Sequence, residues 1–331
     1  MSRKSRRRLT AWSAAALLCS AISLLARTLP LPNNLALLAA VGSPYIPIIA
    51  LLAFVMSILG RRALLAVAAV FVLTATVAVQ VRWHYLGTPT EVGQHTQIRL
   101  ISSNLRKGHA DSPFFVDLAR RNADVLTVSE LTPEDAIRFA KEGINEAFPY
   151  SVLRPAAGAA GVGLWSRFPL AAVGGDAPYA TMVAAQLQVP GVSLDPLVVS
   201  LHVINPIAFE FRAFTEWRTG IRDTKERLNQ FADIAGAGAV IVGGDFNSTP
   251  DMRQFRDLLT DGYRDAVEQT GTGFAPTFPN NNWLPPLITI DHVLTRNAAV
   301  ASIHTARMPG SDHRALLASV QVPLNPDQFR H

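Results

Sequence analysis

Three long apolar stretches lie near the N-terminus of this 331-residue chain. They cover residues 9–25, 35–59 and 63–81, and no aspartate or glutamate occurs anywhere in residues 1–82. A helix needs roughly 20 apolar residues to cross a hydrocarbon core of about 30 Å. The sequence therefore predicts a membrane anchor of about three transmembrane helices over residues 1–82, and buried core helices are the less favoured alternative.

Two of the three stretches carry a further signal. The second contains Pro44 and Pro47, which predict a kink or a broken helix because proline removes a backbone donor. The first could instead be a cleaved signal peptide, which would leave two spans.

The positive charges around these stretches predict their orientation. Basic residues concentrate in the cytoplasmic flanks of membrane proteins. They cluster over residues 3–8 and at Arg61 and Arg62, whereas the loop between the first two stretches holds only Arg27. We therefore expect a multi-pass protein of the cell membrane with a cytoplasmic N-terminus and an extracytoplasmic larger domain.

The net charge of the remaining chain argues against a basic surface that binds nucleic acid. Nine of the 30 basic residues lie in residues 1–82, so residues 83–331 carry 21 basic and 25 acidic side chains, a net charge of −4. The sequence pI of about 9.7 therefore comes from the anchor. The one cysteine, Cys19, lies in the first apolar stretch, which excludes disulfides and thiolate catalysis from the larger domain.

The rest of the chain divides into a tether over 83–96, a domain over 97–322 and a tail over 323–331. The domain alternates strand and helix patterns, typical of an α/β fold. Strands are expected over 97–103, 124–129, 161–166, 183–189, 197–201, 240–243, 287–290, 299–306 and 314–320. Helices are expected over 112–121, 132–148, 209–235 and 249–259. The glycines Gly158, Gly161 and Gly163 are interpreted as flexible loop positions.

Polar side chains follow most of these strands where each strand ends. Side chains at strand ends can converge on one rim of a sheet without entering the core. Taken singly, each is more often a turn residue or a helix cap. The set comprises Asn104, Glu130, His202, Asp245, Asn247 and Asp291, with Asp312 and His313 opening the last strand.

These side chains suit the hydrolysis of a phosphate ester. Carboxylate and amide oxygens are the hard ligands that Mg²⁺ or Mn²⁺ prefers, and Glu130, Asp312 and Asn104 would make such a site together with Asp245. The reaction also needs a clamp on the phosphate oxygens and an activated water. Asp291 could orient His313 through a hydrogen bond. No Gly-x-Ser-x-Gly or Walker-type loop competes with this interpretation.

Several motifs together resemble one known family. They are Ser103-Asn104-Leu105, Val128-Ser129-Glu130, Gly163 to Leu170, Ser200-Leu201-His202, Gly243 to Pro250, Ile290 to Leu294 and Ser311-Asp312-His313. Residues 97–322 resemble the endonuclease/exonuclease/phosphatase superfamily, and the chain is most similar to its bacterial membrane-anchored type. The resemblance implies a four-layer sandwich of two packed β-sheets flanked by helices, preceded here by the transmembrane helices.

The resemblance also implies a role for each matching residue. Glu130 looks like the main metal ligand, with Asn104 and Asp312 beside the metal. His202 resembles the histidine that contacts the scissile phosphate. Asp245 resembles the residue that activates or orients the attacking water, and Asn247 its phosphate-binding neighbour. Asp291 looks like the partner of His313.

We therefore interpret the chain as a membrane-anchored, Mg²⁺- or Mn²⁺-dependent phosphoesterase of the cell envelope. Its phosphoester substrate could be a membrane lipid headgroup. An extracytoplasmic nuclease is the second interpretation, and nucleic acid is a less favoured partner. A catalytically inactive membrane scaffold is the third.

Two segments beside the expected catalytic residues favour a lipid. Pro206–Trp217 carries Phe209, Phe211, Phe214 and Trp217, although a buried helix face is the commoner explanation for such a pattern. Residues 282–288 carry Trp283 and Leu284 near two prolines, which disfavour regular structure. An exposed apolar loop on a tethered domain could enter a bilayer surface.

The predicted topology has a direct test. An alkaline-phosphatase reporter fused after Val322 should be active, because that enzyme folds only outside the cytoplasm, and a fluorescent protein that folds only in the cytoplasm should stay dark at the same position. The opposite pattern would place the larger domain inside.

Overall fold

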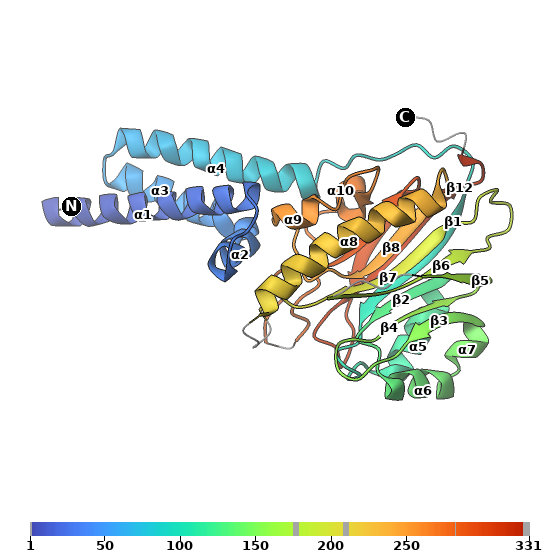
Figure 1. Cartoon of the computed structure of the whole chain (residues 1–331). Coiled ribbons are helices and arrows are strands. Elements are labelled where there is room, and N and C mark those ends of the chain that lie inside the picture. Colours follow the sequence, from blue (N-terminus) through green and yellow to red (C-terminus); the bar gives the residue numbers. More distant parts are fainter. Residues whose placement is uncertain (1, 175–178, 208–211, 282, 327–331) are drawn as a thin grey trace. The chain divides into compact units, whose positions relative to one another are not determined.

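The computed structural model describes residues 2–174, 179–207, 212–281 and 283–326, which form two compact units (Figure 1). The first unit comprises Met1–Leu86 and Pro250–Arg256. The second comprises Gly87–Thr249 and Asp257–His331.

The first unit is helical, and its helices match the three apolar stretches. Two of them, α1 and α4, are long and apolar enough to cross a membrane. The second stretch is broken: α2 and the following helical segment meet at an angle of 45°, and together they would make a third span. Pro44 and Pro47 lie at this break, so the kink expected from the prolines is confirmed. The helices are α1 (Arg3–Thr28), α2 (Asn34–Val41), η1 (Ser43–Tyr45), α3 (Ile46–Leu59) and α4 (Ala63–His84).

Small residues let these helices approach closely. Buried Ser13 and Ser57 share a hydrogen bond of 2.6 Å, and Ser13 also donates to the carbonyl of Ala53 at 3.0 Å. Small residues and interhelical hydrogen bonds of this kind are the interactions that would hold helices together in a bilayer, where lipid tails are as apolar as the helices themselves.

A buried carboxylate joins the segment Pro250–Arg256 to these helices. Asp251 accepts from Arg27 Nε at 2.7 Å and from Gln80 Nε2 at 3.0 Å. Arg27 lies in the last turn of α1 and Gln80 near the end of α4, so both helix ends lie at the same end of the unit. The helix expected over 249–259 was wrong: only α9 (Arg253–Arg256) forms, and the Asp251 side chain pairs with Arg27 and Gln80.

The second unit contains two six-stranded sheets. One has the order β11-β12-β1-β2-β4-β3, and the other has the order β5-β6-β7-β8-β10-β9. Their strands are β1 (His95–Asn104), β2 (Val125–Ser129), β3 (Tyr150–Arg154), β4 (Val162–Ser166), β5 (Leu170–Val173), β6 (Ala180–Leu187), β7 (Leu197–Val203), β8 (Val240–Asp245), β9 (Arg264–Asp265), β10 (Asp291–Arg296), β11 (Ala299–Ala306) and β12 (Ala315–Pro323).

The two sheets pack face to face and helices cover their outer faces (Figure 1). Leu100 and Leu316 of the first sheet meet Ile241 and Val293 of the second in the central core. Buried aromatic side chains fill both outer layers: Phe115 and Phe139 on the first sheet and Trp217 on the second. The expected α/β sandwich of two sheets flanked by helices is confirmed. The helices are α5 (Ser112–Asn122), α6 (Pro133–Lys141), α7 (Ile144–Ala147), α8 (Ala213–Ala235) and α10 (Ala266–Thr270).

Three local expectations were wrong. The helix over 132–148 is broken into α6 and α7 at Gly143, whose left-handed φ of 77° favours glycine. No strand covers 287–290; β10 begins at Asp291 itself. Gly161 and Gly163 are not flexible loop positions: a Cβ at Gly161 would lie 1.8 Å from the carbonyl oxygen of Leu131, and Gly163 is buried within β4.

Some expectations fall on residues outside the described ranges. The helix expected from 209 is described from Ala213, and Phe209 and Phe211 lie outside the described residues. The tail is described as far as residue 326.

Candidate active site

The register of the second sheet places three of the predicted residues in one row. His202 on β7 pairs with Asp245 on β8, and Asp245 pairs with Asp291 on β10. Side chains at paired positions point to the same face of a sheet. In the first sheet, Asn104 at the end of β1 pairs with Ser129, the residue before Glu130. Strand register therefore accounts for much of the site.

Asp245 lies at the centre of this group. Its side chain is buried, and Oδ2 accepts from Asn104 Nδ2 at 2.9 Å. Oδ2 also lies 3.8 Å from both His202 Nε2 and His313 Nε2. The other oxygen, Oδ1, accepts from the backbone N–H of Asn247 at 2.7 Å. A buried carboxylate is thus surrounded by donors on several sides.

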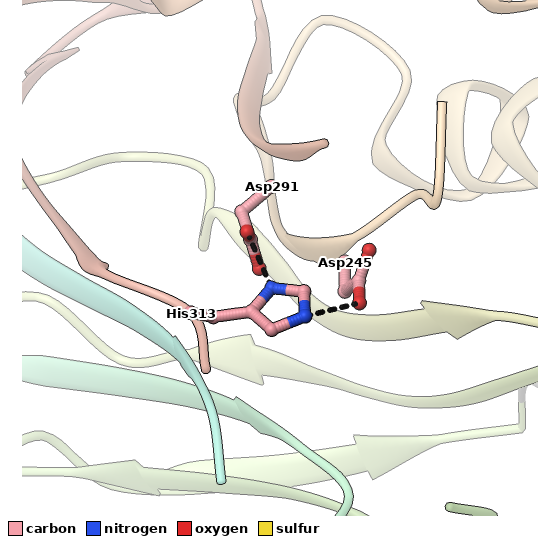
Figure 2. A group of neighbouring side chains, drawn as sticks. All are labelled: Asp245, Asp291 and His313. Atoms are coloured by element: carbon pink, nitrogen blue, oxygen red, sulfur yellow. Dashed lines mark hydrogen bonds and ion pairs between the residues drawn. The ribbon is translucent and has the colours of Figure 1, made fainter. Parts of the chain in front are cut away.

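His313 bridges the two aspartates of the second sheet (Figure 2). Its Nδ1 lies 2.8 Å from Asp291 Oδ2, while Nε2 faces Asp245. Burial disfavours the charged imidazolium, but the carboxylates of Asp291 and Asp245 outweigh that effect and raise the pKa of His313 to about 10. Burial and the neighbouring charge of Asp291 raise the pKa of Asp245 to about 6. At neutral pH His313 is therefore a cation.

His202 and Asn247 form the opposite side of the group. His202 Nδ1 lies 2.8 Å from the carbonyl of Ala159, so Nδ1 carries the hydrogen and Nε2 points into the site. Asn247 Nδ2 donates to the carbonyl of Val203 at 2.8 Å and lies 3.4 Å from His202 Nε2. Both side chains are almost fully buried, so each is held in one orientation.

Glu130 and Asn104 complete the group on the side of the first sheet. Asn104 Nδ2 donates to Glu130 Oε1 at 3.2 Å as well as to Asp245. Glu130 and Asn247 both have left-handed backbones, with φ of 59° and 46°. Such a conformation costs a non-glycine residue of order 1–3 kcal/mol and clusters at functional sites.

Asp312 is more exposed than the other predicted residues. Its side chain is 38% exposed, and its Oδ2 lies 3.8 Å from Arg106 Nε. Its place beside a metal remains a prediction.

Oxygen donors rather than the imidazole fit a divalent cation here. The ligand atoms of Asp245, Asp291 and His313 lie within 4.8 Å of one another. However, an imidazole with a pKa near 10 must lose its proton before it can bind a metal. Glu130 and Asp245 instead both point their oxygens at the amide group of Asn104. A hard cation between these two carboxylates would neutralise their negative charge, which the Asn104 amide now meets only as a hydrogen-bond donor.

The sequence interpretation missed the residues that hold the His313 loop. Asn280 Nδ2 donates to the carbonyls of Met308, Ser311 and His313 at 2.7, 3.0 and 3.2 Å. The ring of Phe278 packs on the imidazole of His313 at a centroid distance of 5.1 Å. Both lie in a stretch whose sequence indicates only a loop.

The sequence matches one known family. The sequence profile of the endonuclease/exonuclease/phosphatase family matches residues 87–313, more than half of the chain. The chain belongs to the endonuclease/exonuclease/phosphatase family. A comparison with curated proteins finds no match.

Several solved structures share the fold. An endonuclease/exonuclease/phosphatase from Beutenbergia cavernae is 18% identical at a TM-score of 0.52, covering 69% of this chain and 72% of that one. The 3′ phosphatase NExo from Neisseria, bound to a product DNA hairpin, is 17% identical at 0.53, covering 67% and 98%. TDP2 from D. rerio, complexed with a single-strand DNA product, is 16% identical at 0.52, covering 68% and 99%. At these identities the similarity shows the fold alone.

The raised pKa of His313 predicts a loss of stability at alkaline pH. Imidazole titrates near 6.5 when unfolded, so the imidazolium stabilises the fold fully below pH 6.5, and this contribution disappears as the pH rises through 10. The unfolding midpoint of the full chain, measured with a chelator present, should fall more steeply between pH 6.5 and 10 than that of His313→Gln. Equal slopes would show that the imidazolium does not stabilise the fold.

Proposed function

We propose that this protein is a membrane-anchored, divalent-metal-dependent phosphoesterase that acts at the cell envelope. The observation that carries the proposal is the convergence of four buried side chains, His202, Asp245, Asp291 and His313, with the partly exposed Glu130 beside them. Buried ionisable groups with raised pKa values are typical of catalytic sites. Membership of a phosphoesterase family supports the same chemistry.

Asp245 is the proposed general base. Its pKa near 6 keeps the carboxylate ionised at neutral pH yet basic enough to take a proton from water. Its Oδ1 accepts from the Asn247 amide, and Oδ2, which accepts one hydrogen bond from Asn104, has a second lone pair that can orient the attacking water.

The two histidines and Asn247 form the proposed clamp on the phosphate. His313 is a cation held by Asp291, so Nε2–H can donate to a phosphate oxygen as negative charge builds up. His202 turns Nε2 toward the phosphate from the other side, because Nδ1–H donates to the Ala159 carbonyl; Nε2 donates to a phosphate oxygen when the ring is protonated. The amide group of Asn247 lies next to it.

Glu130 is the proposed main ligand of a Mg²⁺ or Mn²⁺ ion, with Asn104 and Asp245 beside it and Asp312 at the outer margin. Such an ion, when bound, polarises a phosphoryl oxygen and neutralises charge on the phosphate. Glu130 follows the end of β2 with a left-handed backbone, and its Oε1 accepts from Asn104 Nδ2 at 3.2 Å.

The arrangement of the first unit supports an anchor that crosses the membrane. The C-terminal ends of α1 and α4 both meet Asp251, so an odd number of crossings separates the N-terminus from that end of the unit. The basic residues 3–8 at the start of α1 then mark the cytoplasmic side, and the catalytic domain lies outside.

An exposed apolar loop supports a lipid-headgroup substrate. Trp283 is 93% exposed and Leu284 53% exposed, and both backbone N–H groups donate to Asn281 Oδ1. The neighbouring Asn280 binds the carbonyls around His313, so the loop is attached directly to the proposed site. By contrast Trp217 is fully buried, so the segment 206–217 does not offer that ring to a bilayer.

A nuclease is the second candidate, because relatives of the same fold were solved with DNA products. Binding a polyanion depends on how many phosphates the protein neutralises. Residues 83–331 carry a net charge of −4, which would repel the phosphates of DNA or RNA, so nucleic acid is the less favoured substrate.

The proposed roles predict how activity responds to metals and to mutation. Chelation should abolish hydrolysis of a soluble phosphodiester by the full chain, and Mg²⁺ or Mn²⁺ should restore it. Glu130→Gln, Asp245→Asn and His313→Ala should each lower kcat roughly 10²- to 10⁴-fold while circular dichroism stays unchanged. Wild-type turnover in any variant would remove that residue from the site.

The substrate class predicts a preference that can be measured directly. The full chain should hydrolyse a phospholipid in mixed micelles faster than DNA. Trp283→Ala should lower the rate on micellar lipid several-fold more than the rate on a soluble phosphodiester, whereas Leu194→Ala, another exposed apolar residue, should not change that ratio. Efficient cleavage of DNA with no action on lipid would favour the nuclease.

A further inference from the structure

A second buried histidine–aspartate pair lies behind the proposed active site. His292 follows Asp291 on β10, and successive strand residues point to opposite faces. His292 therefore points away from the face that carries Asp291, and only 2% of it is exposed. The proposed mechanism does not use this imidazole.

Both ring nitrogens of His292 face hydrogen-bond acceptors. Nδ1 lies 2.8 Å from Asp265 Oδ2, and Nε2 lies 2.9 Å from the backbone carbonyl of Ser248. A carbonyl oxygen can only accept, so Nε2 carries a hydrogen. The ring also meets the ring of Phe246 edge-on at 5.6 Å, which fixes its plane.

Asp265 is itself held in place. Its Oδ1 accepts from the backbone N–H groups of Val267 at 2.8 Å and Glu268 at 3.3 Å, where it caps α10. Because its other oxygen faces His292, the carboxylate joins the imidazole to a fixed helix end. The position of the His292 ring is therefore set by α10 and does not depend on the segment that contains Ser248.

The Ser248 carbonyl, which accepts the hydrogen bond from His292 Nε2, belongs to the Asp245–Thr249 loop. Ser248 follows Asn247, whose left-handed φ of 46° needs support from its surroundings. The Ser248 hydroxyl accepts from Trp217 Nε1 at 3.0 Å and donates to the carbonyl of Phe246 at 2.8 Å. His292 and Trp217 therefore hold Ser248 through its backbone and its side chain.

We propose that His292 is a positioning residue for phosphoester hydrolysis. Its Nε2–H holds the Ser248 carbonyl and thereby the left-handed turn that aims the Asn247 carboxamide at the phosphate site. This inference rests on the function proposed above. The dipeptide Asp291-His292 then serves the site twice: Asp291 orients His313 on one face of β10, and His292 supports the Asn247 loop on the other.

Two substitutions separate the two hydrogen bonds of the ring. The amide nitrogen of His292→Gln reaches approximately the position of Nε2, so it can still donate to Ser248. The amide nitrogen of His292→Asn corresponds to Nδ1, so it keeps only the contact to Asp265. We expect the Asn variant to lower kcat/KM for a soluble phosphodiester roughly 10- to 100-fold, since a 1 Å misplacement can cost that much, and the Gln variant to recover most of it.

Hydrogen exchange of the full chain gives a readout that does not depend on activity. Asn247 N–H is protected by Asp245 Oδ1, so peptides covering 245–249 should exchange faster in His292→Asn than in wild type and in His292→Gln. Thr295→Ala is the matched control. It removes two buried side-chain hydrogen bonds further along β10, one to the Ala298 carbonyl and one from Gln269, and it should lower the unfolding midpoint without changing kcat/KM or exchange in 245–249.

The outcomes distinguish this inference from the proposed function. A wild-type chain that hydrolyses no phosphoester would overturn the proposed function, and the exchange experiment would still test the role of His292. Equal exchange and equal kcat/KM in the Asn and Gln variants would overturn the positioning role. If both variants unfold at lower temperature yet keep wild-type kinetics and exchange, His292 is only a core residue.

Discussion

The burial of the Asp245 carboxylate is the constraint on which the rest of the site depends. A carboxylate removed from water is costly unless hydrogen bonds and opposite charge compensate it. Here Asn104 and the Asn247 amide donate to it, and the imidazoles of His202 and His313 lie 3.8 Å away. The compensation is incomplete, because burial and Asp291 still raise its pKa to about 6. The same deficit makes this carboxylate a suitable base and a suitable neighbour for a cation.

Two glycines before Asp245 leave no room for a side chain. A Cβ at Gly243 would lie 2.4 Å from Thr127 Oγ1 of the other sheet, so this glycine lets the two sheets approach closely. A Cβ at Gly244 would lie 2.0 Å from the carbonyl oxygen of Leu201 on β7, the neighbouring strand of the same sheet. Ser129 and Ser200 donate across the same interface to carbonyls of the opposite sheet. The Gly-Gly-Asp sequence thus delivers the central carboxylate at the point where packing is tightest.

The sequence predicted the parts of this structure that depend on short patterns. Apolar stretches without acids predicted the helices of the first unit, and Pro44 and Pro47 predicted the break between α2 and α3. Polar residues at strand ends, with the motif resemblance, predicted the two-sheet fold. Contacts that depend on distant residues were not predictable in this way. No local pattern connects His292 to Asp265, or Asn280 to the carbonyls around His313, and Gly161 gave no sign of the Leu131 carbonyl that excludes a side chain there.

We propose that a divalent cation binds between Glu130 and Asp245. Mn²⁺ binding to the full chain, followed by electron paramagnetic resonance of the free ion, tests this site without depending on a substrate. The wild-type protein should bind Mn²⁺, Glu130→Gln should weaken binding at least tenfold, and Mg²⁺ should compete for the site. Unchanged Mn²⁺ affinity in Glu130→Gln, or no Mn²⁺ binding by the wild-type chain, would contradict this proposal.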